Sequence, residues 1–82
     1  MHDEKPASEK LLYLIHYCLG RQFVPVQEIA LHLDCCKKQA IRLMNKVHDM
    51  QYELGFIVVD LIKEDHIKQL KIRIQLDRKY AI

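Results

Sequence analysis

The sequence lacks the residues on which many enzyme active sites depend. Threonine is absent, Ser8 is the single serine, and the 82-residue chain has only two glycines, Gly20 and Gly55. A nucleophilic hydroxyl activated by a neighbouring base therefore has no candidate inside the fold. No glycine-rich loop is present to cradle a phosphate group, and the five histidines are scattered without paired carboxylates. We therefore predict that the protein is not an enzyme.

Long hydrophobic runs and an even set of cysteines are also missing. No apolar stretch approaches the roughly 18 residues that a membrane-spanning helix needs, and no charged and then apolar leader opens the chain. The three cysteines are an odd number, and adjacent Cys35 and Cys36 cannot form a disulfide of ordinary geometry. These features predict a protein of the reducing cytoplasm that makes no membrane contact.

Histidine and cysteine do come together once, at His32, Cys35 and Cys36. A structural zinc ion needs four such ligands and a catalytic zinc ion needs three with an open position. No second Cys-x-x-Cys or His-x-x-x-His pair completes the set, so we predict no metal and no cofactor. Cys36, beside Lys37 at the start of an expected helix, remains a candidate redox-sensitive thiol. Cys18 and Cys35 are expected to pack as small apolar residues.

The chain does contain three segments of helical periodicity. A first helix is expected from Glu9 to about Arg21, after a flexible segment of residues 1–8 in which Ser8 caps the helix. A second helix should run from Pro25 to Leu33, and a third from about Lys37 to Leu54. The apolar stripe predicted for the first helix consists of Leu11, Leu12, Leu14, Ile15, Cys18 and Leu19.

After Gly55 the periodicity changes to that of strands. "FIVVDLI" is β-branched and apolar, and "LKIRIQL" alternates strictly between apolar and polar residues, with the polar "KEDHIKQ" between them as a turn. Because two strands alone are marginal in water, the face of Leu70, Ile72, Ile74 and Leu76 should pack on the helices. The sequence therefore predicts one α+β domain over residues 9–77, with three helices, a two-stranded β-hairpin and a C-terminal tail of residues 78–82.

Charge is unevenly distributed, although the net charge is only +2. Residues 1–36 carry three basic and five acidic side chains, whereas residues 37–82 carry ten basic and six acidic ones. Four basic residues and no acidic residue lie between Lys37 and Lys46. Such a local basic run is typical of a surface that faces a polyanion, and it is equally compatible with a solvated helix face.

The stretch "EIALHLDCCKKQAIRLMNKV" resembles the helix-turn-helix of bacterial winged-helix regulators of the DeoR, biotin-repressor and Mga types. The buried positions of that pattern are filled by Ile29, Ala30, Leu33, Cys35, Ala40, Met44 and Val47. Asp34 stands where the turn usually has glycine, and aspartate tolerates left-handed geometry better than most residues. Cys36 replaces the capping serine, which weakens the helix cap by roughly 0.5–1.5 kcal/mol.

The resemblance implies a transcription regulator that binds double-stranded DNA. The third helix, about residues 37–54, would enter the major groove, and the hairpin, about residues 56–76, would form a wing on the flanking backbone. Arg42 would contact guanine, and Gln39 or Asn45 would contact adenine. The remaining expected DNA contacts are phosphate contacts by Lys37, Lys38 and Lys46 and wing contacts by Lys63, Lys68 and Arg73.

Two further expectations concern partners. A single module of this size makes a limited DNA interface, so a homodimer on paired half-sites is expected, with Tyr13 and Tyr17 of the first helix as candidates for that contact. The alternative function is a winged-helix adaptor that binds other proteins and not DNA, because a fold does not determine a function. The sequence identifies no small-molecule effector.

Overall fold

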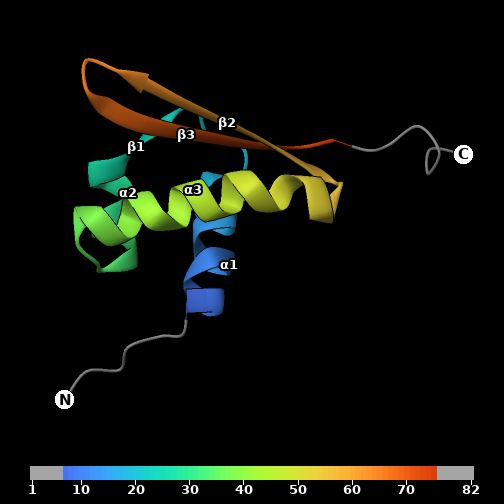
Figure 1. Ribbon diagram of the computed structural model, residues 1–82, viewed down its shortest axis with the longest axis horizontal. Helices are drawn as coiled ribbons and strands as arrows, with labels where there is room; N and C mark the ends of the chain where they lie inside the picture. The colour runs from blue at the N-terminus through green and yellow to red at the C-terminus, as the bar shows by residue number, and fades with distance from the viewer. Residues whose placement is uncertain (1–6, 76–82) are drawn as a thin grey trace, which may run out of the picture.

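The computed structural model describes residues 7–75, which form three helices and three strands. In chain order these are α1 (Ala7–Cys18), β1 (Val24–Pro25), α2 (Val26–Leu33), α3 (Lys37–Leu54), β2 (Ile57–Glu64) and β3 (Ile67–Ile74). The strands form one antiparallel sheet in the order β1-β3-β2 (Figure 1). The predicted α+β class and the three predicted helices are confirmed. Leu76 and the predicted tail of residues 78–82 lie outside the described residues.

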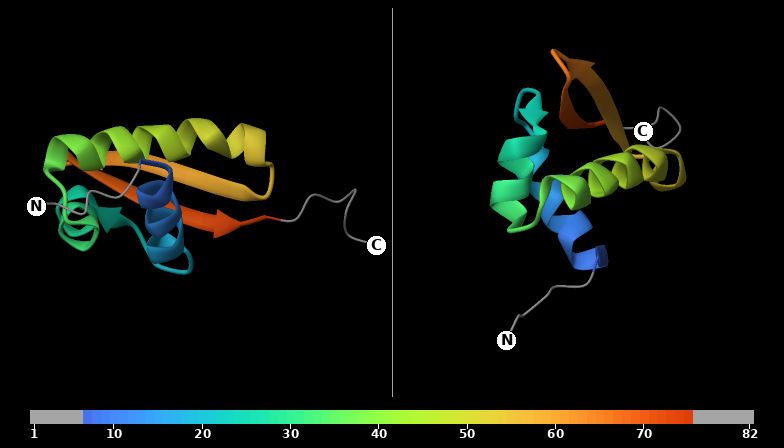
Figure 2. Two further views of the ribbon diagram at one scale, coloured as in Figure 1. Left: turned by 90° about the horizontal axis from the view of Figure 1, so that it is seen from below. Right: turned by 60° about the vertical axis from the view of Figure 1, so that its left-hand side comes forward.

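The core lies between the sheet and the helices, and α3 is the longest of the elements that line it. Figure 2 shows α3 running along the β2–β3 pair, with α1 crossing it steeply. The helical period of 3.6 residues places the buried residues of α3 on one line, and the strand period of two places those of β2 and β3 on one face. The residues buried from these three elements are Ala40, Leu43, Met44, Val47, Ile57, Val59, Leu70 and Ile72.

The predicted face of β3 is buried only in part. Leu70 and Ile72 are buried in the core, whereas the side chain of Ile74 is 62% exposed. Ile74 is the last residue of β3, paired with Ile57 at the first position of β2. The apolar alternation of the sequence therefore continues beyond the part of the strand that the helices cover.

The turn between α2 and α3 has the geometry that the sequence predicts. Asp34 adopts φ 53° and ψ 53°, in the left-handed region, and its backbone N–H reaches the carbonyl groups of the last turn of α2. Cys36 precedes α3 in an extended conformation, without a side-chain hydrogen bond to the helix. Gly55 ends α3 at φ 75°. The bend therefore contains a left-handed aspartate and a helix start that no side chain caps.

The sheet contains one strand more than the predicted hairpin. β1 pairs with β3 through Val24 opposite Leu70 and Pro25 opposite Gln69. Val24 is buried, so its apolar side chain anchors the segment to the core. Proline has no backbone N–H and is tolerated at a sheet edge, which is where β1 lies. The prediction of only two strands was wrong because a two-residue strand leaves no periodicity to detect.

The connection between β2 and β3 is tighter than predicted. The two strands pair residue for residue from Ile57 opposite Ile74 to Glu64 opposite Ile67, so only Asp65 and His66 form the turn. Both turn residues have positive φ values, 51° and 65°, as the two-residue turns that suit twisted hairpins require. Lys63 and Lys68, predicted to lie in the loop, are therefore strand residues.

Helix α1 differs from its prediction in two details. It begins at Ala7, so Ser8 lies within the helix and does not precede it as a cap, and it ends at Cys18. Leu12 is 68% exposed, whereas Leu11, Leu14 and Cys18 are buried. The prediction of Leu12 as a core residue was wrong, because the sheet and α3 cover a narrower stripe of α1 than its apolar residues span.

Candidate nucleic-acid interface

Helix α3 presents two opposite faces. Ala40, Met44 and Val47 are completely buried, so they fix the rotation of the helix about its own axis. The predicted residues on the opposite face are all exposed, and they are Lys38, Arg42, Asn45 and Lys46. Lys37 and Gln39, in the first turn of the helix, are exposed as well. The structure therefore brings the predicted contacts of this helix together on one open surface.

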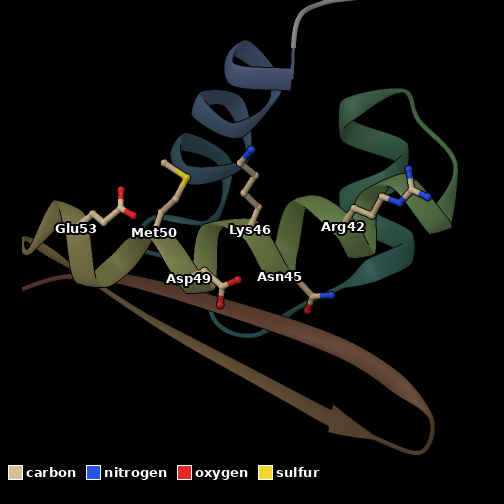
Figure 3. A pocket seen from close by; sticks show the side chains of 6 residues that line it. All are labelled: Arg42, Asn45, Lys46, Asp49, Met50 and Glu53. Atoms are coloured by element: carbon tan, nitrogen blue, oxygen red, sulfur yellow. The ribbon is translucent and has the colours of Figure 1, made fainter.

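The charge on the exposed face of α3 changes from positive to negative along the helix. Figure 3 shows a groove lined by side chains of α3 alone, with Arg42, Asn45 and Lys46 in its first half and Asp49 and Glu53 in its second. In the same view Lys46 extends towards α1, while Asn45 and Asp49 point to the side of the hairpin. A polyanion would be attracted to the first half of this groove and repelled by the second.

The start of α3 adds backbone donors to the basic half. The first N–H groups of a helix have no partners within the helix, and the helix dipole makes that end electropositive. Cys36, at the capping position, makes no side-chain hydrogen bond to them, and Lys37 and Lys38 follow at once. The uncapped amides and the lysine side chains are therefore available to the same anion.

The hairpin brings two lysines to the side of the sheet that faces α3. Lys63 and Lys68 lie directly opposite each other across β2 and β3, and their register places them on the same face as buried Val59, Leu70 and Ile72. Lys68 Nζ donates a hydrogen bond of 3.1 Å to Asn45 Oδ1. Like charges directly opposite in a sheet are destabilising, and an anion between helix and hairpin would remove that cost.

Arg73 lies apart from the other predicted contacts. Its register places it on the opposite face of the sheet from Lys63 and Lys68, as the sequence alternation predicted. Arg73 Nε lies 3.6 Å from Asp60 Oδ2, in an ion pair whose two side chains are both exposed. Arg73 therefore cannot share a contact surface with α3 unless a ligand wraps around the sheet.

Gln51 fixes the hairpin to α3. Its Oε1 accepts a hydrogen bond of 2.9 Å from the backbone N–H of Val59, and its Nε2 donates one of 2.8 Å to the carbonyl of His48. The hairpin is thus attached to α3 by Gln51 near one end and by Lys68 and Asn45 near the tip.

A polar cluster that the sequence did not predict joins α1 to α2. Tyr17 donates a hydrogen bond of 2.5 Å to Glu28 Oε2, and its ring stacks on His32 with 3.9 Å between ring centroids. The guanidinium of Arg21 lies 4.1 Å from the centroid of the same ring. The hydrogen bond to Glu28 is the main cause of a raised pKa for the Tyr17 hydroxyl. Tyr17 is therefore engaged within the chain and orients α2, which carries the turn before α3.

The three cysteines lie in different environments. Burial raises the pKa of the Cys18 thiol to about 12, so Cys18 behaves as an apolar core residue. Burial also raises the pKa of Cys35, although the positive charge of Lys10 opposes that effect. Cys36 is exposed at the start of α3. Cys36 is therefore the most exposed of the three thiols, and it lies beside the basic half of the helix.

Within residues 7–75, no three side chains of histidine, cysteine, aspartate or glutamate come together as a metal site would require. None of the three described helices is long and apolar enough to cross a membrane. Comparisons of the chain with protein-family models, curated proteins and solved structures gave no match.

Proposed function

We propose that the protein is a regulator of the winged helix-turn-helix type that binds double-stranded DNA through α3 and the β2–β3 hairpin. Three helices and a three-stranded antiparallel sheet are compatible with that fold. In this proposal α2, the left-handed Asp34 and α3 form the helix-turn-helix, and the hairpin is the wing. The proposal gives the open basic face of α3 a polyanionic partner.

The observation that carries the proposal is the junction between helix and hairpin. The hydrogen bond from Lys68 to Asn45 makes the exposed face of α3 continuous with the lysine pair of the hairpin. A surface with cations on a helix and on a neighbouring hairpin fits a groove and the phosphate strand beside it. If the basic face of α3 were only a solvated surface, Lys63 and Lys68 of the hairpin would have no reason to lie on the side of the sheet that faces α3.

The major groove of B-form DNA is about 12 Å wide, which accommodates a helix about 10–12 Å in diameter. The basic segment from Lys37 to Lys46 spans about 15 Å along the helix axis. The following residues, Asp49 and Glu53, would then lie where the helix leaves the groove. Arg42 lies in the middle of the basic segment and suits a two-pronged contact to guanine, while Lys37 and Lys38 suit phosphates.

The contact between Lys68 and Asn45 refines the expected base contacts. An asparagine that reads adenine uses its amide oxygen as acceptor and its amide nitrogen as donor. The oxygen of Asn45 already accepts a hydrogen bond from Lys68, so its NH2 group is the freer half of the side chain. Asn45 then suits a base edge that presents acceptors, such as guanine, and Gln39 remains the better candidate for adenine.

A titration of random-sequence duplex DNA tests the proposal at about 50 mM and about 200 mM salt. Wild-type binding should weaken steeply with salt, and Lys38→Ala/Arg42→Ala should lower affinity about tenfold or more with a slope reduced by about one. Lys71→Ala/Arg73→Ala removes the same charge from the other sheet face and should weaken binding much less. The proposal is overturned if wild type does not bind at low salt or if both double variants lose affinity equally.

A protein-binding adaptor is the second candidate, and one surface favours it. Tyr52, Phe56 and Ile74 are all exposed where α3 ends, β2 begins and β3 ends. Clustered apolar side chains of this kind are typical of protein contacts. A second copy of the chain on a paired half-site would cover the same surface. Analytical ultracentrifugation with and without DNA distinguishes a regulator that self-associates from a monomer in which Tyr52, Phe56 and Ile74 stay exposed.

A further inference from the structure

A second basic site lies away from the exposed face of α3. A cleft of about 480 Å³ opens between residues 19–22, which connect α1 to β1, and residues 71–74 of β3. We refer to it as the loop–β3 cleft. Its volume falls within the usual range for small-ligand sites, roughly 300–1,000 Å³. It shares no lining residue with the groove along α3.

Among residues 7–75, every charged side chain that lines the loop–β3 cleft is basic. These are Arg21 from the loop and Lys71 and Arg73 from β3. The groove along α3, in contrast, contains two acidic residues as well as two basic ones. Three like charges around one hollow repel one another, so an anion that enters it is favoured by all three.

The loop positions Arg21 at the cleft by contacts within the chain. Its Nε donates a hydrogen bond of 2.6 Å to the carbonyl of Tyr17, and its guanidinium stacks over the Tyr17 ring. Gly20 permits this bend with φ +79°, and no atom lies within 4 Å of the position that a Cβ would take. The two terminal nitrogens of Arg21 remain as donors in a fixed orientation.

The β3 cations are only weakly neutralised. Lys71 Nζ lies 5.9 Å from the centroid of the Phe23 ring, at the outer limit of a cation–π contact. Arg73 pairs with the exposed Asp60 at 3.6 Å, and exposed ion pairs of this kind are worth little. Three cations and this one carboxylate give a local balance of +2, which a dianion would neutralise.

We propose that the loop–β3 cleft binds a small ligand that carries a phosphate group, held by Arg21, Lys71 and Arg73. A phosphate monoester carries close to two negative charges near pH 7 and offers three acceptor oxygens, one for each cation. Arginine forms two-pronged hydrogen bonds to phosphate, and lysine acts as a point charge. The site is independent of DNA binding by α3 and would give the protein a place for an anionic effector.

Inorganic phosphate is the first probe. Its binding is monitored for each residue in amide nitrogen–proton correlation spectra of the full chain, at constant ionic strength. Saturable shifts should be confined to residues 19–22 and 71–74, with a millimolar dissociation constant. Lys71→Gln/Arg73→Gln should weaken binding about tenfold or more, since two of the three charge-assisted contacts to the phosphate are lost. Arg73→Gln alone should show a smaller loss, and the spectrum outside the cleft should stay that of wild type.

A matched control removes the same charge elsewhere. Lys63→Gln/Lys68→Gln takes two lysines from the hairpin on the other sheet face and should leave phosphate binding at the cleft within about twofold of wild type. If the shifts appear at all basic residues and grow without saturation, phosphate only screens positive charge in general, and the proposal is overturned. Saturable shifts on α3 in place of the cleft would overturn it as well.

A second titration distinguishes a free phosphate ligand from a DNA backbone. Duplex DNA should shift α3 and the hairpin, and phosphate added afterwards should still shift residues 19–22 and 71–74. If DNA itself saturates the cleft and excludes phosphate, the site is a backbone contact and not a small-ligand site. If DNA does not bind while phosphate does, the DNA-binding proposal fails and the cleft stands alone.

Discussion

The first half of α3, from Lys37 to Lys46, exposes only basic and amide side chains around its partly buried Ile41, whereas the second half exposes Asp49 and Glu53. Both halves are attached to the hairpin, but by different kinds of bond. Asn45 accepts an exposed hydrogen bond from a lysine side chain, while Gln51 accepts one from the backbone of Val59, which is buried. The comparison indicates that one helix combines an open charged surface with an anchor for the sheet.

The buried line that the two halves share should produce the largest effect on stability. Met44 is completely buried at the middle of α3, so Met44→Ala should lower the free energy of unfolding by about 2–5 kcal/mol through lost contacts and a cavity. Lys38→Ala changes an exposed residue and should stay within about 0.5 kcal/mol of wild type. Urea denaturation checks both. Equal losses in the two variants would show that the assigned faces of α3 are wrong.

The two charged halves should respond in opposite directions to neutralisation. Arg42→Ala should weaken DNA binding by about 1–3 kcal/mol, the range for one good contact to a base pair. Glu53→Ala removes a repelling carboxylate and should leave affinity unchanged or tighten it slightly. Fluorescence anisotropy with one duplex at fixed salt compares them. Weaker binding in Glu53→Ala would place the second half of α3 against the DNA and contradict the division of the helix into two halves.

The two attachments of the hairpin should differ in their effect on stability. Gln51→Met leaves the Val59 N–H without its acceptor and should cost about 1–3 kcal/mol. Asn45→Ala breaks a bond between exposed side chains and should cost about 0.5 kcal/mol or less. Thermal unfolding by circular dichroism gives both values. A larger loss for Asn45→Ala than for Gln51→Met would reverse the roles that we assign to the two halves.

The smallest expected effect concerns base preference at the position that Asn45 would contact in the proposed complex with DNA. Lys68→Met frees the Asn45 oxygen and should shift the preference towards adenine by a few-fold. Lys63→Met removes the same charge from the residue opposite, which makes no hydrogen bond to Asn45 among those observed. Selection of bound duplexes from a randomised pool measures both. If the two variants keep the same preference, Lys68 does not restrict Asn45.

Much of α3 could be predicted from the sequence because its two faces follow one period. A step of 100° per residue places Ala40, Met44 and Val47 together and Arg42 on the other side, and the structure has the same division. The left-handed turn at Asp34 was expected from the resemblance, because Asp34 stands where that pattern usually has glycine and aspartate tolerates this geometry. The error at Leu12 shows the limit of this reasoning, since a period shows which residues share a face and not how wide the covering layer is.

Contacts between elements distant in sequence were not predictable. The bond between Asn45 and Lys68 spans 23 residues, and the cluster around Tyr17 joins α1 to α2 across 11. The loop–β3 cleft depends on a loop near residue 20 meeting a strand near residue 72, where Leu19 and Ile72 form an isolated bridge. Nothing in the spacing of Arg21, Lys71 and Arg73 along the chain indicates that they surround one hollow.

Local sequence patterns were sufficient to predict the α+β class, the three helices, the buried line of α3 and the charge of its exposed face. These are properties of local periodicity, because the face on which a residue lies depends only on its neighbours along one helix or strand. Only the folded chain shows the third strand, the junction of helix and hairpin, and the meeting of three cations at the loop–β3 cleft. Those features depend on how elements pack against one another, and packing is set by the whole core and not by any single segment.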